Sequence, residues 1–237
     1  MGVQKKRIAL VTGATKGIGR AIAFELALAG YDLLLAARSL ENLKALEEAI
    51  RTQYPETGVA SCACDLATAA GCEALLRWAS VRQVSVLVNN LGVYHPVSVL
   101  EETEADFAHQ WQANYVTPHR LARGLAVEMM GKGEGHIVNI TSVAAKTPVV
   151  TAGTYSVTKA ALRSLTHVLR EELRAHGVRV TEVVPGSTKT ASWSGAPFPD
   201  SRFVMPSDVA SAVRLALDVS KGASIDEVVV APRQGNI

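Results

Sequence analysis

Short runs of apolar residues alternate along the chain with longer segments in which apolar residues recur at helical spacing. Most of the short runs are apolar at nearly every position, which predicts strands that are buried on both faces. Such strands are typical of a parallel sheet covered by helices, because an antiparallel sheet with one wet face would alternate apolar and polar residues. Seven strands are predicted, at Ile8–Val11, Leu33–Ala37, Val59–Cys64, Val84–Val88, His136–Ile140, Val178–Val184 and Glu227–Val230.

The longer segments predict crossover helices between these strands, joined by right-handed connections. Ser39 and Ser207 are the expected N-caps, and Gly30 and Gly177 are the expected helix stops. The helices are predicted near residues 17–29, 40–53, 68–80, 103–130, 155–176 and 207–219. No repeat, linker or charge block divides the alternation, so we expect residues 1–237 to form a single α/β domain.

The stretch from Pro185 to Pro206 interrupts the alternation, because four prolines and two glycines break any helical or strand period. It follows directly after a predicted strand. Long loops in compact domains are usually lids or binding loops, with surface padding as the alternative. We expect a substrate loop near residues 187–205.

Composition narrows the class of protein. Hydrophobic residues make up 48% of the 237 positions, and 24 Lys and Arg against 22 Asp and Glu leave a net charge of +2, far from the basic footprint of a nucleic-acid binder. The cysteines, Cys62, Cys64 and Cys72, indicate neither a disulfide framework nor a zinc site. The basic start, Met1–Arg7, is not followed by an export signal, and no apolar run approaches the roughly 18 residues of a membrane span. We therefore expect a cytoplasmic protein without metal, nucleic-acid or membrane partner.

A glycine-rich bend joins the first predicted strand to the first predicted helix. The bend contains Gly13, Thr15, Lys16, Gly17, Ile18 and Gly19. Glycines let the backbone turn tightly and approach a phosphate, whose charge is stabilised by the unpaired N–H groups of the helix start. The GxxxGxG spacing is neither the commoner GxGxxG nor a P-loop, and a plain tight turn is the alternative. Its place in the first βαβ unit favours a dinucleotide site in a doubly wound, Rossmann-type parallel sheet.

The end of the second predicted strand lacks the acid that NAD-binding domains place on the ribose 2′-hydroxyl. Arg38 stands there instead. With Lys16, it can donate charge-assisted hydrogen bonds of about 1.5–3 kcal/mol to a 2′-phosphate, which predicts a roughly ten- to hundredfold preference for NADP(H) over NAD. A solvated surface arginine is the alternative.

Ser142, Tyr155 and Lys159 form a candidate catalytic set. Tyr155 and Lys159 lie four residues apart on one predicted helix and therefore share a face. A free tyrosine titrates near pH 10, and an adjacent ammonium together with a cationic nicotinamide could bring its pKa toward neutrality. Tyr155 is then a candidate general acid or base, whereas in isolation such a pair is usually a surface pair.

Taken together with the glycine bend, these residues make the chain resemble the short-chain dehydrogenase/reductase family. The resemblance is to the compact single-domain branch and covers essentially the full length. It is similar to 3-oxoacyl-[acyl-carrier-protein] reductases. The matching motifs occur in order: Thr12-Gly13-xxx-Gly17-x-Gly19, Asp65, Asn89-Asn90-Leu91-Gly92, Asn114, Ser142, Tyr155-xxx-Lys159, and Pro185-Gly186 with Thr190. The spacing of 13 residues between Ser142 and Tyr155 is also that of the family.

The resemblance implies a role for each matched residue. Tyr155 would donate or remove the alcohol proton, and Ser142 would orient the substrate oxygen. Lys159 would hold the nicotinamide ribose and lower the pKa of Tyr155. Asn114 would hold a water that links Lys159 to solvent, or would simply cap or kink its helix. The implied cofactor contacts are Gly13, Thr15, Lys16, Gly17, Ile18, Gly19, Arg38, Asp65 at the adenine, Leu66, Asn89, Leu91, Gly92, Tyr155, Lys159, and Pro185, Gly186, Thr188 and Thr190 at the carboxamide.

Two positions depart from the family pattern. Leu91 stands where alanine is common, and its larger side chain puts in question how much space is left beneath the cofactor. Thr188 stands where isoleucine or valine is frequent, but there the backbone makes the family contact. Four further residues either border the substrate or pack elsewhere: Tyr94, His95, Trp193 and Phe198.

The sequence thus predicts an oxidoreductase that moves hydride between NADP(H) and a carbonyl/alcohol pair, with carbonyl reduction as the expected direction. A 3-oxoacyl thioester is the leading substrate by analogy with the family, and a steroid, sugar, pterin or small ketone is the alternative. A non-catalytic nucleotide-binding regulator is a further alternative, against which the intact Ser142, Tyr155 and Lys159 set weighs. The family also implies a homodimer or homotetramer, paired through the helices near 103–130 and 155–176.

Overall fold

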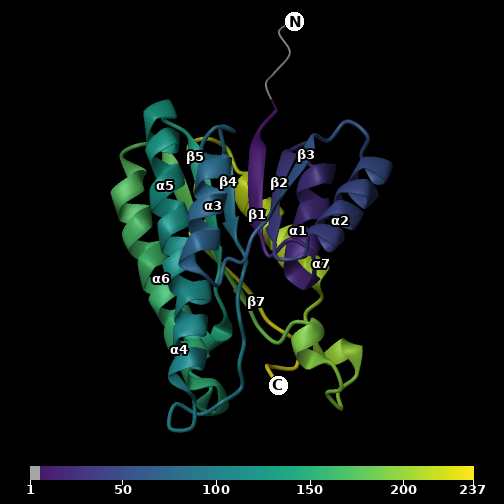
Figure 1. Cartoon of the computed structure of the whole chain (residues 1–237), viewed down its shortest axis with the longest axis vertical. Helices are drawn as coiled ribbons and strands as arrows, with labels where there is room; N and C mark the ends of the chain where they lie inside the picture. Colours follow the sequence, from purple (N-terminus) through teal and green to yellow (C-terminus); the bar gives the residue numbers. More distant parts are fainter. Residues whose placement is uncertain (1–5) are drawn as a thin grey trace, which may run out of the picture.

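A computed structural model describes residues 6–237 of the chain, so the first part of the basic start, residues 1–5, lies outside the described residues. Within them, one parallel sheet has the strand order β3-β2-β1-β4-β5-β6-β7 (Figure 1). The strands are β1 (Ile8–Thr12), β2 (Asp32–Ala37), β3 (Val59–Ala63), β4 (Val86–Asn89), β5 (Gly135–Ile140), β6 (Val178–Pro185) and β7 (Glu227–Val230). The predicted doubly wound parallel sheet is confirmed.

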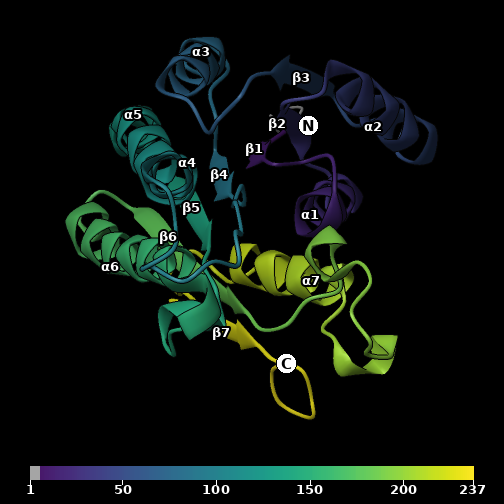
Figure 2. The same ribbon diagram turned by 60° about the horizontal axis from the view of Figure 1, so that its bottom comes forward.

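Helices cover both faces of the sheet (Figure 2). They are α1 (Gly17–Leu28), α2 (Leu40–Gln53), α3 (Ala69–Ala79), α4 (Glu104–Trp111), α5 (Thr117–Lys132), α6 (Gly153–Arg174) and α7 (Pro206–Leu217). Alternate strand residues face opposite layers: Ala9 and Val11 pack with α1, α2 and α7, whereas Leu10 packs with α3, α5 and α6. Both layers are apolar, which explains why the strands are apolar at nearly every position.

Several helix ends follow from local sequence. The Ser39 side chain accepts a hydrogen bond from the Asn42 N–H, 3.2 Å, and so caps α2 as predicted. The predicted cap at Ser207 is wrong, because α7 already begins at Pro206. There the Asp208 carboxylate accepts from the Met205 N–H at 2.8 Å, and proline suits the first helical turn.

The helix predicted over 103–130 is divided into α4 and α5 by a π-helical segment, Gln112–Val116. The extra residue in this turn shifts the following side chains around the axis, a change that apolar periodicity does not register. Asn114 lies within the segment and is fully buried. A predicted site residue therefore coincides with the irregularity.

The predicted long loop, residues 185–206, is partly ordered by backbone pairing. Thr188 and Val204 form a parallel bridge, with the Val204 N–H donating to the Ser187 carbonyl at 2.9 Å. Two short 3-10 turns lie between them, at Ala191–Trp193 and Asp200–Arg202. The two ends of the loop are therefore held together by backbone pairing at the carboxyl end of the sheet.

Candidate active site

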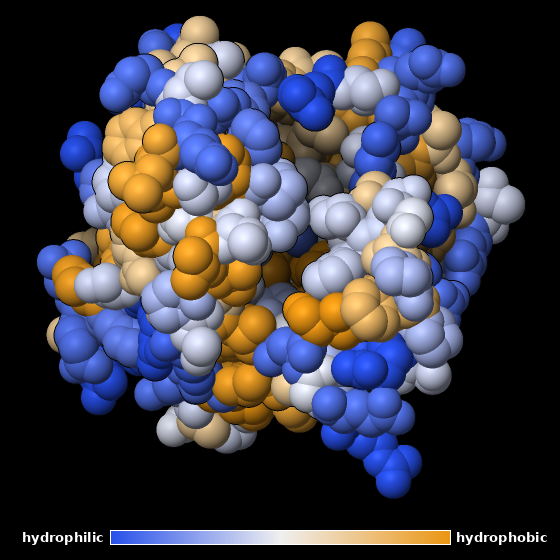
Figure 3. Space-filling model, turned by 90° about the horizontal axis from the view of Figure 1, so that it is seen from below, coloured by the Kyte–Doolittle hydropathy of each residue, from blue (hydrophilic) through white to orange (hydrophobic). Residues whose placement is uncertain are grey.

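A cavity of about 770 Å³ opens at the carboxyl ends of the strands, where β1 and β4 are neighbours and the strand order reverses direction. Seen from this end, the surface is hollowed between the two halves of the molecule (Figure 3). All predicted site residues except Asn89 and Asn114 line it. The lining residues among them are Gly13, Thr15, Lys16, Gly17, Ile18, Gly19, Arg38, Asp65, Leu66, Leu91, Gly92, Ser142, Tyr155, Lys159, Pro185, Gly186, Thr188 and Thr190.

The glycine bend has the conformation that its residues predict. Gly13 and Gly17 have φ of +64° and +47°, values that residues with a Cβ rarely adopt. A Cβ on Gly19 would overlap the Gly13 carbonyl oxygen, so the helix can approach the bend this closely only with glycine. No described side chain caps the start of α1, which leaves its first N–H groups at the cavity. This arrangement can hold an anion.

The Asn-Asn-Leu-Gly motif joins β4 to β1 beneath the bend. The Thr12 hydroxyl accepts from the Asn90 and Leu91 N–H groups, each at 3.0 Å, and the Asn90 amide donates to the Thr12 carbonyl at 2.8 Å. Asn89, a predicted cofactor contact, does not line the cavity: its side chain is buried and donates to Asn139 Oδ1 at 2.9 Å. A strand's alternation sends adjacent side chains to opposite faces, so Asn90 lines the cavity instead.

Charged side chains line the cavity where β2 and β3 end. Arg38 and Lys16 are both exposed and line the cavity beside Ser39 and Asn42. Asp65 follows β3, and one of its carboxylate oxygens accepts from the Ala67 N–H at 3.1 Å. Two cationic side chains thus flank the start of α1 and the end of β2.

Ser142, Tyr155 and Lys159 converge on the cavity from β5 and α6. The Ser142 hydroxyl oxygen accepts from the Ala144 N–H at 3.1 Å, which fixes its orientation. Tyr155 and Lys159 lie on the first two turns of α6, and the Lys159 ammonium stands 5.8 Å from the centre of the Tyr155 ring. The ammonium donates to the Ile140 carbonyl, 2.9 Å, at the end of the strand that leads to Ser142.

Asn114 lies behind these residues and does not line the cavity. Its Oδ1 accepts from the Val93 N–H at 2.7 Å, and its Nδ2 donates to the Val93 carbonyl at 2.9 Å and the Thr158 hydroxyl at 3.0 Å. The side chain therefore ties the segment after β4 to the residue before Lys159. The water that the family resemblance assigns to Asn114 stays a prediction. The alternative, that Asn114 caps or kinks its helix, agrees with its place in the π-helical segment.

Burial controls the ionisation of the two titratable groups of this set. Burial lowers the pKa of Lys159 from 10.5 to about 8. Burial also raises the pKa of Tyr155; a hydrogen bond with Ser142 opposes that rise, and Tyr94 adds to it. The prediction that Lys159 and a cationic nicotinamide together bring the pKa of this phenol toward neutrality stays a prediction; within the protein alone, burial holds the pKa of Tyr155 above its ordinary value.

Three lining residues had no cofactor or catalytic role assigned to them from the sequence. The Tyr94 ring stands edge-on to the Tyr155 ring, with centroids 5.1 Å apart and planes at 88°. Asn90 belongs to the quoted motif, and strand alternation could have selected it over Asn89. Asn236 gave no signal: its Oδ1 accepts from the Ser187 N–H at 3.1 Å across 49 residues of chain.

The residues left open between pocket and packing divide evenly. Tyr94 and Trp193 line the cavity, and Trp193 also packs edge-on against Phe203. His95 is paired with Asp106 at 3.1 Å, and Phe198 lies beneath the Arg202 guanidinium; neither lines the cavity.

The two departures from the family pattern also have defined places. Leu91 is half-buried, lines the cavity and packs against the core under α3 and α5. Thr188 is buried, and its hydroxyl donates to the Gly186 carbonyl at 2.9 Å, which stabilises the turn after β6.

The cysteines are free, and burial raises the pKa of Cys64 to about 12, which suppresses its reactivity. Among residues 6–237, no helix combines the length and the apolar character needed to cross a bilayer.

Comparison with known proteins identifies the family. The family model described as short chain dehydrogenase matches residues 7–197. The chain is 34% identical over 184 residues to the uncharacterised oxidoreductase YvaG of Bacillus subtilis, an alignment that covers 78% of this chain and 69% of that protein. It is 33% identical over 183 residues to the very-long-chain 3-oxoacyl-CoA reductase let-767 of Caenorhabditis briggsae, covering 75% of this chain and 58% of that longer protein.

A solved structure extends the likeness to three dimensions. A metagenomic short-chain oxidoreductase in complex with NADP superposes with a TM-score of 0.83 at 34% identity, covering 95% of this chain and 96% of that one. The chain therefore belongs to the short-chain dehydrogenase family of oxidoreductases, which act on alcohol and carbonyl groups.

Proposed function

We propose that this chain is an NADPH-dependent ketone reductase. In this proposal Tyr155 donates a proton to the substrate carbonyl oxygen while Ser142 hydrogen-bonds the same oxygen. One observation carries it: Ser142, Tyr155 and Lys159 line the same cavity as the glycine bend. A proton donor and an anion cradle thus face one space, as hydride transfer coupled to proton transfer requires.

The residues present fit the proposed cofactor. The open start of α1 and the close approach at Gly19 suit a pyrophosphate, and Arg38 with Lys16 suits a 2′-phosphate. Asp65 would contact the adenine, and the segment Pro185–Thr190 the carboxamide. The NADP complex of the metagenomic relative supports this choice. When bound, the cofactor would supply the hydride.

Lys159 and Asn114 complete the proposed proton path. Lys159 would bind the nicotinamide ribose hydroxyls, and its pKa of about 8 suits an ammonium that exchanges its proton near neutral pH. Asn114 would hold a water between Lys159 and solvent. Its two contacts with Val93 and one with Thr158 fix the amide next to this lysine.

We propose a 3-oxoacyl thioester as the substrate. The likeness to let-767, whose name states that it reduces very-long-chain 3-oxoacyl-CoA, supports a substrate of this class. The cavity that holds Ser142 and Tyr155 also has several apolar lining residues, which suits an acyl chain. The apolar lining residues there are Val93, Tyr94, Val143, Pro148, Val149 and Trp193.

A screen of NADPH consumption tests the proposal. Acetoacetyl thioesters, diketones, quinones and steroids serve as candidate substrates, and the thioesters are expected to give the highest kcat/KM. Tyr155→Phe should lower kcat by about 10²–10⁴-fold, the usual contribution of a general acid, and leave the Kd for NADPH nearly unchanged in a fluorescence titration. Retained turnover in this variant would show that Tyr155 is not the proton donor.

We further propose a homodimer or homotetramer in the cytoplasm, where the three free thiols would stay reduced. Val157 and Val168 on α6 are 54% and 51% exposed, and Val127 on α5 is 71% exposed, as the predicted pairing of these helices needs. Sedimentation should give a dimer or tetramer, and Val168→Glu should weaken it. Val81→Glu, at a 78% exposed valine outside these helices, is the matched control. A purely monomeric wild type would contradict the assembly.

A further inference from the structure

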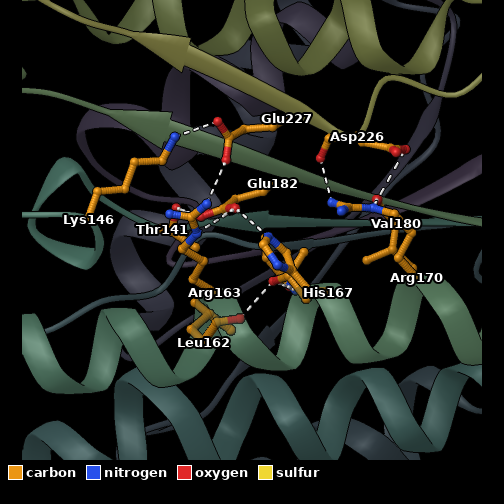
Figure 4. A network of polar contacts seen from close by, with 12 residues as sticks. Thr141, Lys146, Leu162, Arg163, His167, Arg170, Val180, Glu182, Asp226 and Glu227 are labelled. Carbon is orange, nitrogen blue, oxygen red and sulfur yellow. Dashed lines mark hydrogen bonds and ion pairs between the residues drawn. The ribbon is translucent and has the colours of Figure 1, made fainter.

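A group of charged residues lies next to the catalytic serine but outside the cavity, between β6, β7 and α6 (Figure 4). At its centre is Glu182 on β6, which is fully buried and is the only buried acid in the described part of the chain. Its Oε1 accepts from the Thr141 hydroxyl at 2.7 Å. Its Oε2 lies 3.6 Å from the Arg163 Nε and 3.4 Å from the His167 Nε2.

The partners of Glu182 belong to the two elements that carry the catalytic residues. Thr141 directly precedes Ser142, and its N–H donates to the Val183 carbonyl at 2.9 Å. Arg163 lies on α6 one turn beyond Lys159 and two turns beyond Tyr155. A single carboxylate therefore contacts both the chain that leads to Ser142 and the helix that presents Tyr155.

Because the Glu182 carboxylate is buried, it needs these contacts with its partners. A buried carboxylate without partners costs several kcal/mol, so its position is set by the groups that neutralise it. Arg163 also contacts Glu227 at 3.3 Å, and Lys146 pairs with the other oxygen of Glu227. The carboxylate oxygen Oε2 makes no hydrogen bond, so ion pairing alone compensates it.

The same cluster contains His167, Glu182 and Glu227, whose ligand atoms lie within 4.8 Å of one another as a metal site would require. Two positive side chains, Arg163 and Lys146, already face the two carboxylates. A divalent cation bound there would lie close to both of these positive charges, which opposes its binding. The cluster is therefore better explained as a structural ion-pair network.

We propose that Glu182 is a positioning residue for Ser142, which it holds through the Thr141 hydroxyl while Arg163 fixes the distance to α6. This inference rests on the proposed function, because it concerns the same serine and tyrosine. Its consequence is specific. Loosening Thr141 should displace the Ser142 hydroxyl from Tyr155, without moving the glycine bend on β1 and α1.

Three variants separate positioning from general stability. Thr141→Val removes the donor to Glu182, and we expect kcat to fall roughly 3- to 10-fold, the equivalent of one buried hydrogen bond, with the Kd for NADPH unchanged. Glu182→Gln keeps an acceptor for Thr141 but removes the ion pair with Arg163, so it should retain more of kcat than Thr141→Val does while lowering thermal stability. Thr181→Val is the control: this buried hydroxyl donates to the Ile225 carbonyl and contacts His136, so its loss should lower thermal stability and leave kcat unchanged.

A second readout does not depend on the substrate. The phenol of Tyr155 can be titrated in the NADP⁺-bound protein by tyrosinate absorbance, as the difference between each protein and the same protein carrying Tyr155→Phe. Thr141→Val should raise the pKa of this phenol, because Ser142 then supports the phenolate less well, and Thr181→Val should not.

The outcomes divide cleanly. If Thr141→Val changes kcat and the phenol pKa no more than the control Thr181→Val does, the positioning role is overturned. If no carbonyl compound is reduced, the proposed function fails while the titration still decides this inference. Stoichiometric Zn²⁺ binding that Glu227→Gln abolishes would overturn the ion-pair interpretation.

Discussion

The two halves of the cavity are built in different ways. The half formed by β1, α1 and β2 uses backbone: two glycines with positive φ, a third that permits close approach, and the uncapped N–H groups of a helix. The half formed by β5, α6 and the 185–206 loop uses side chains that come from distant parts of the chain. Binding of a common cofactor therefore depends on local geometry, and catalysis on long-range assembly.

This difference predicts how each half fails. A change in the glycine backbone of the first half should abolish nucleotide binding, because no neighbouring side chain can replace an N–H group. A change in the side-chain half should alter rate, pH dependence or substrate choice and leave binding largely intact. The following variants test whether the two halves of the cavity fail in these different ways.

Gly19→Ala should produce the largest effect. The added Cβ would overlap the Gly13 carbonyl oxygen, so the bend must open or α1 must shift. We expect the Kd for NADPH, measured by fluorescence, to rise by at least about 100-fold, because several backbone hydrogen bonds to phosphate are lost together. Gly131→Ala on α5 is the control: open space surrounds this glycine, so alanine should stabilise the helix by up to about 1 kcal/mol and leave binding unchanged. Normal NADPH binding by Gly19→Ala would refute the backbone account.

Arg38→Asp should change which cofactor is used. Arg38 is exposed and lines the cavity at the end of β2. An aspartate there repels a 2′-phosphate and can accept from a 2′-hydroxyl, so the ratio of kcat/KM for NADPH to that for NADH should fall roughly ten- to hundredfold or more and invert. Arg123→Asp, at an exposed arginine on α5, should leave the ratio unchanged. Equal or better turnover of NADH by the wild type would contradict the preference itself.

The same contrast explains what sequence could anticipate. The strands, the bend and the parallel sheet follow from short-range patterns, since apolar runs and glycine spacing act within about twenty residues. Asn89 was included among the cofactor contacts as part of its motif, but its side chain donates to Asn139, and it is the neighbouring Asn90 that lines the cavity.

Features that depend on tertiary contact escaped the sequence. The π-helical segment around Asn114 interrupts a continuous helical period, and Asn236 reaches Ser187 only because the chain returns after β7. The sequence also did not reveal that burial raises the pKa of Tyr155, because i, i+4 spacing carries no information on burial in the folded chain.

The pH dependence of reduction should follow Lys159. Burial gives this lysine a folded-state pKa of about 8, so it loses its charge as the pH rises through that value. The phenol of Tyr155 stays protonated, because its pKa is raised. We expect kcat/KM to fall by up to tenfold per pH unit above about pH 8.

Stability should change in the opposite sense over the same range. Between about pH 8 and 10.5, the ordinary pKa of a lysine, the unfolded chain binds more protons at Lys159 than the folded chain does. The contribution of this group to the free energy of unfolding therefore rises with pH across that window. Denaturant titrations of wild type and Lys159→Met should show the difference, wild type minus variant, increasing from pH 7 to pH 10. A parallel loss of activity and stability would mean that another group controls the profile.

Tyr94→Ala should give the smallest effect and locates the boundary between the two halves. The ring packs edge-on against Tyr155 at 5.1 Å, is 43% exposed and lines the cavity, so in the proposed function it would border both the substrate and the phenol. An aromatic pair contributes about 0.5–1.5 kcal/mol, which predicts a 2- to 12-fold loss of kcat/KM, with the Kd for NADPH unchanged. Tyr94→Phe keeps the ring and should retain the rate. If both variants lose activity equally, the Tyr94 hydroxyl rather than its ring contributes to the site, and if Tyr94→Ala weakens NADPH binding as well, catalysis and cofactor binding are not separable at this residue.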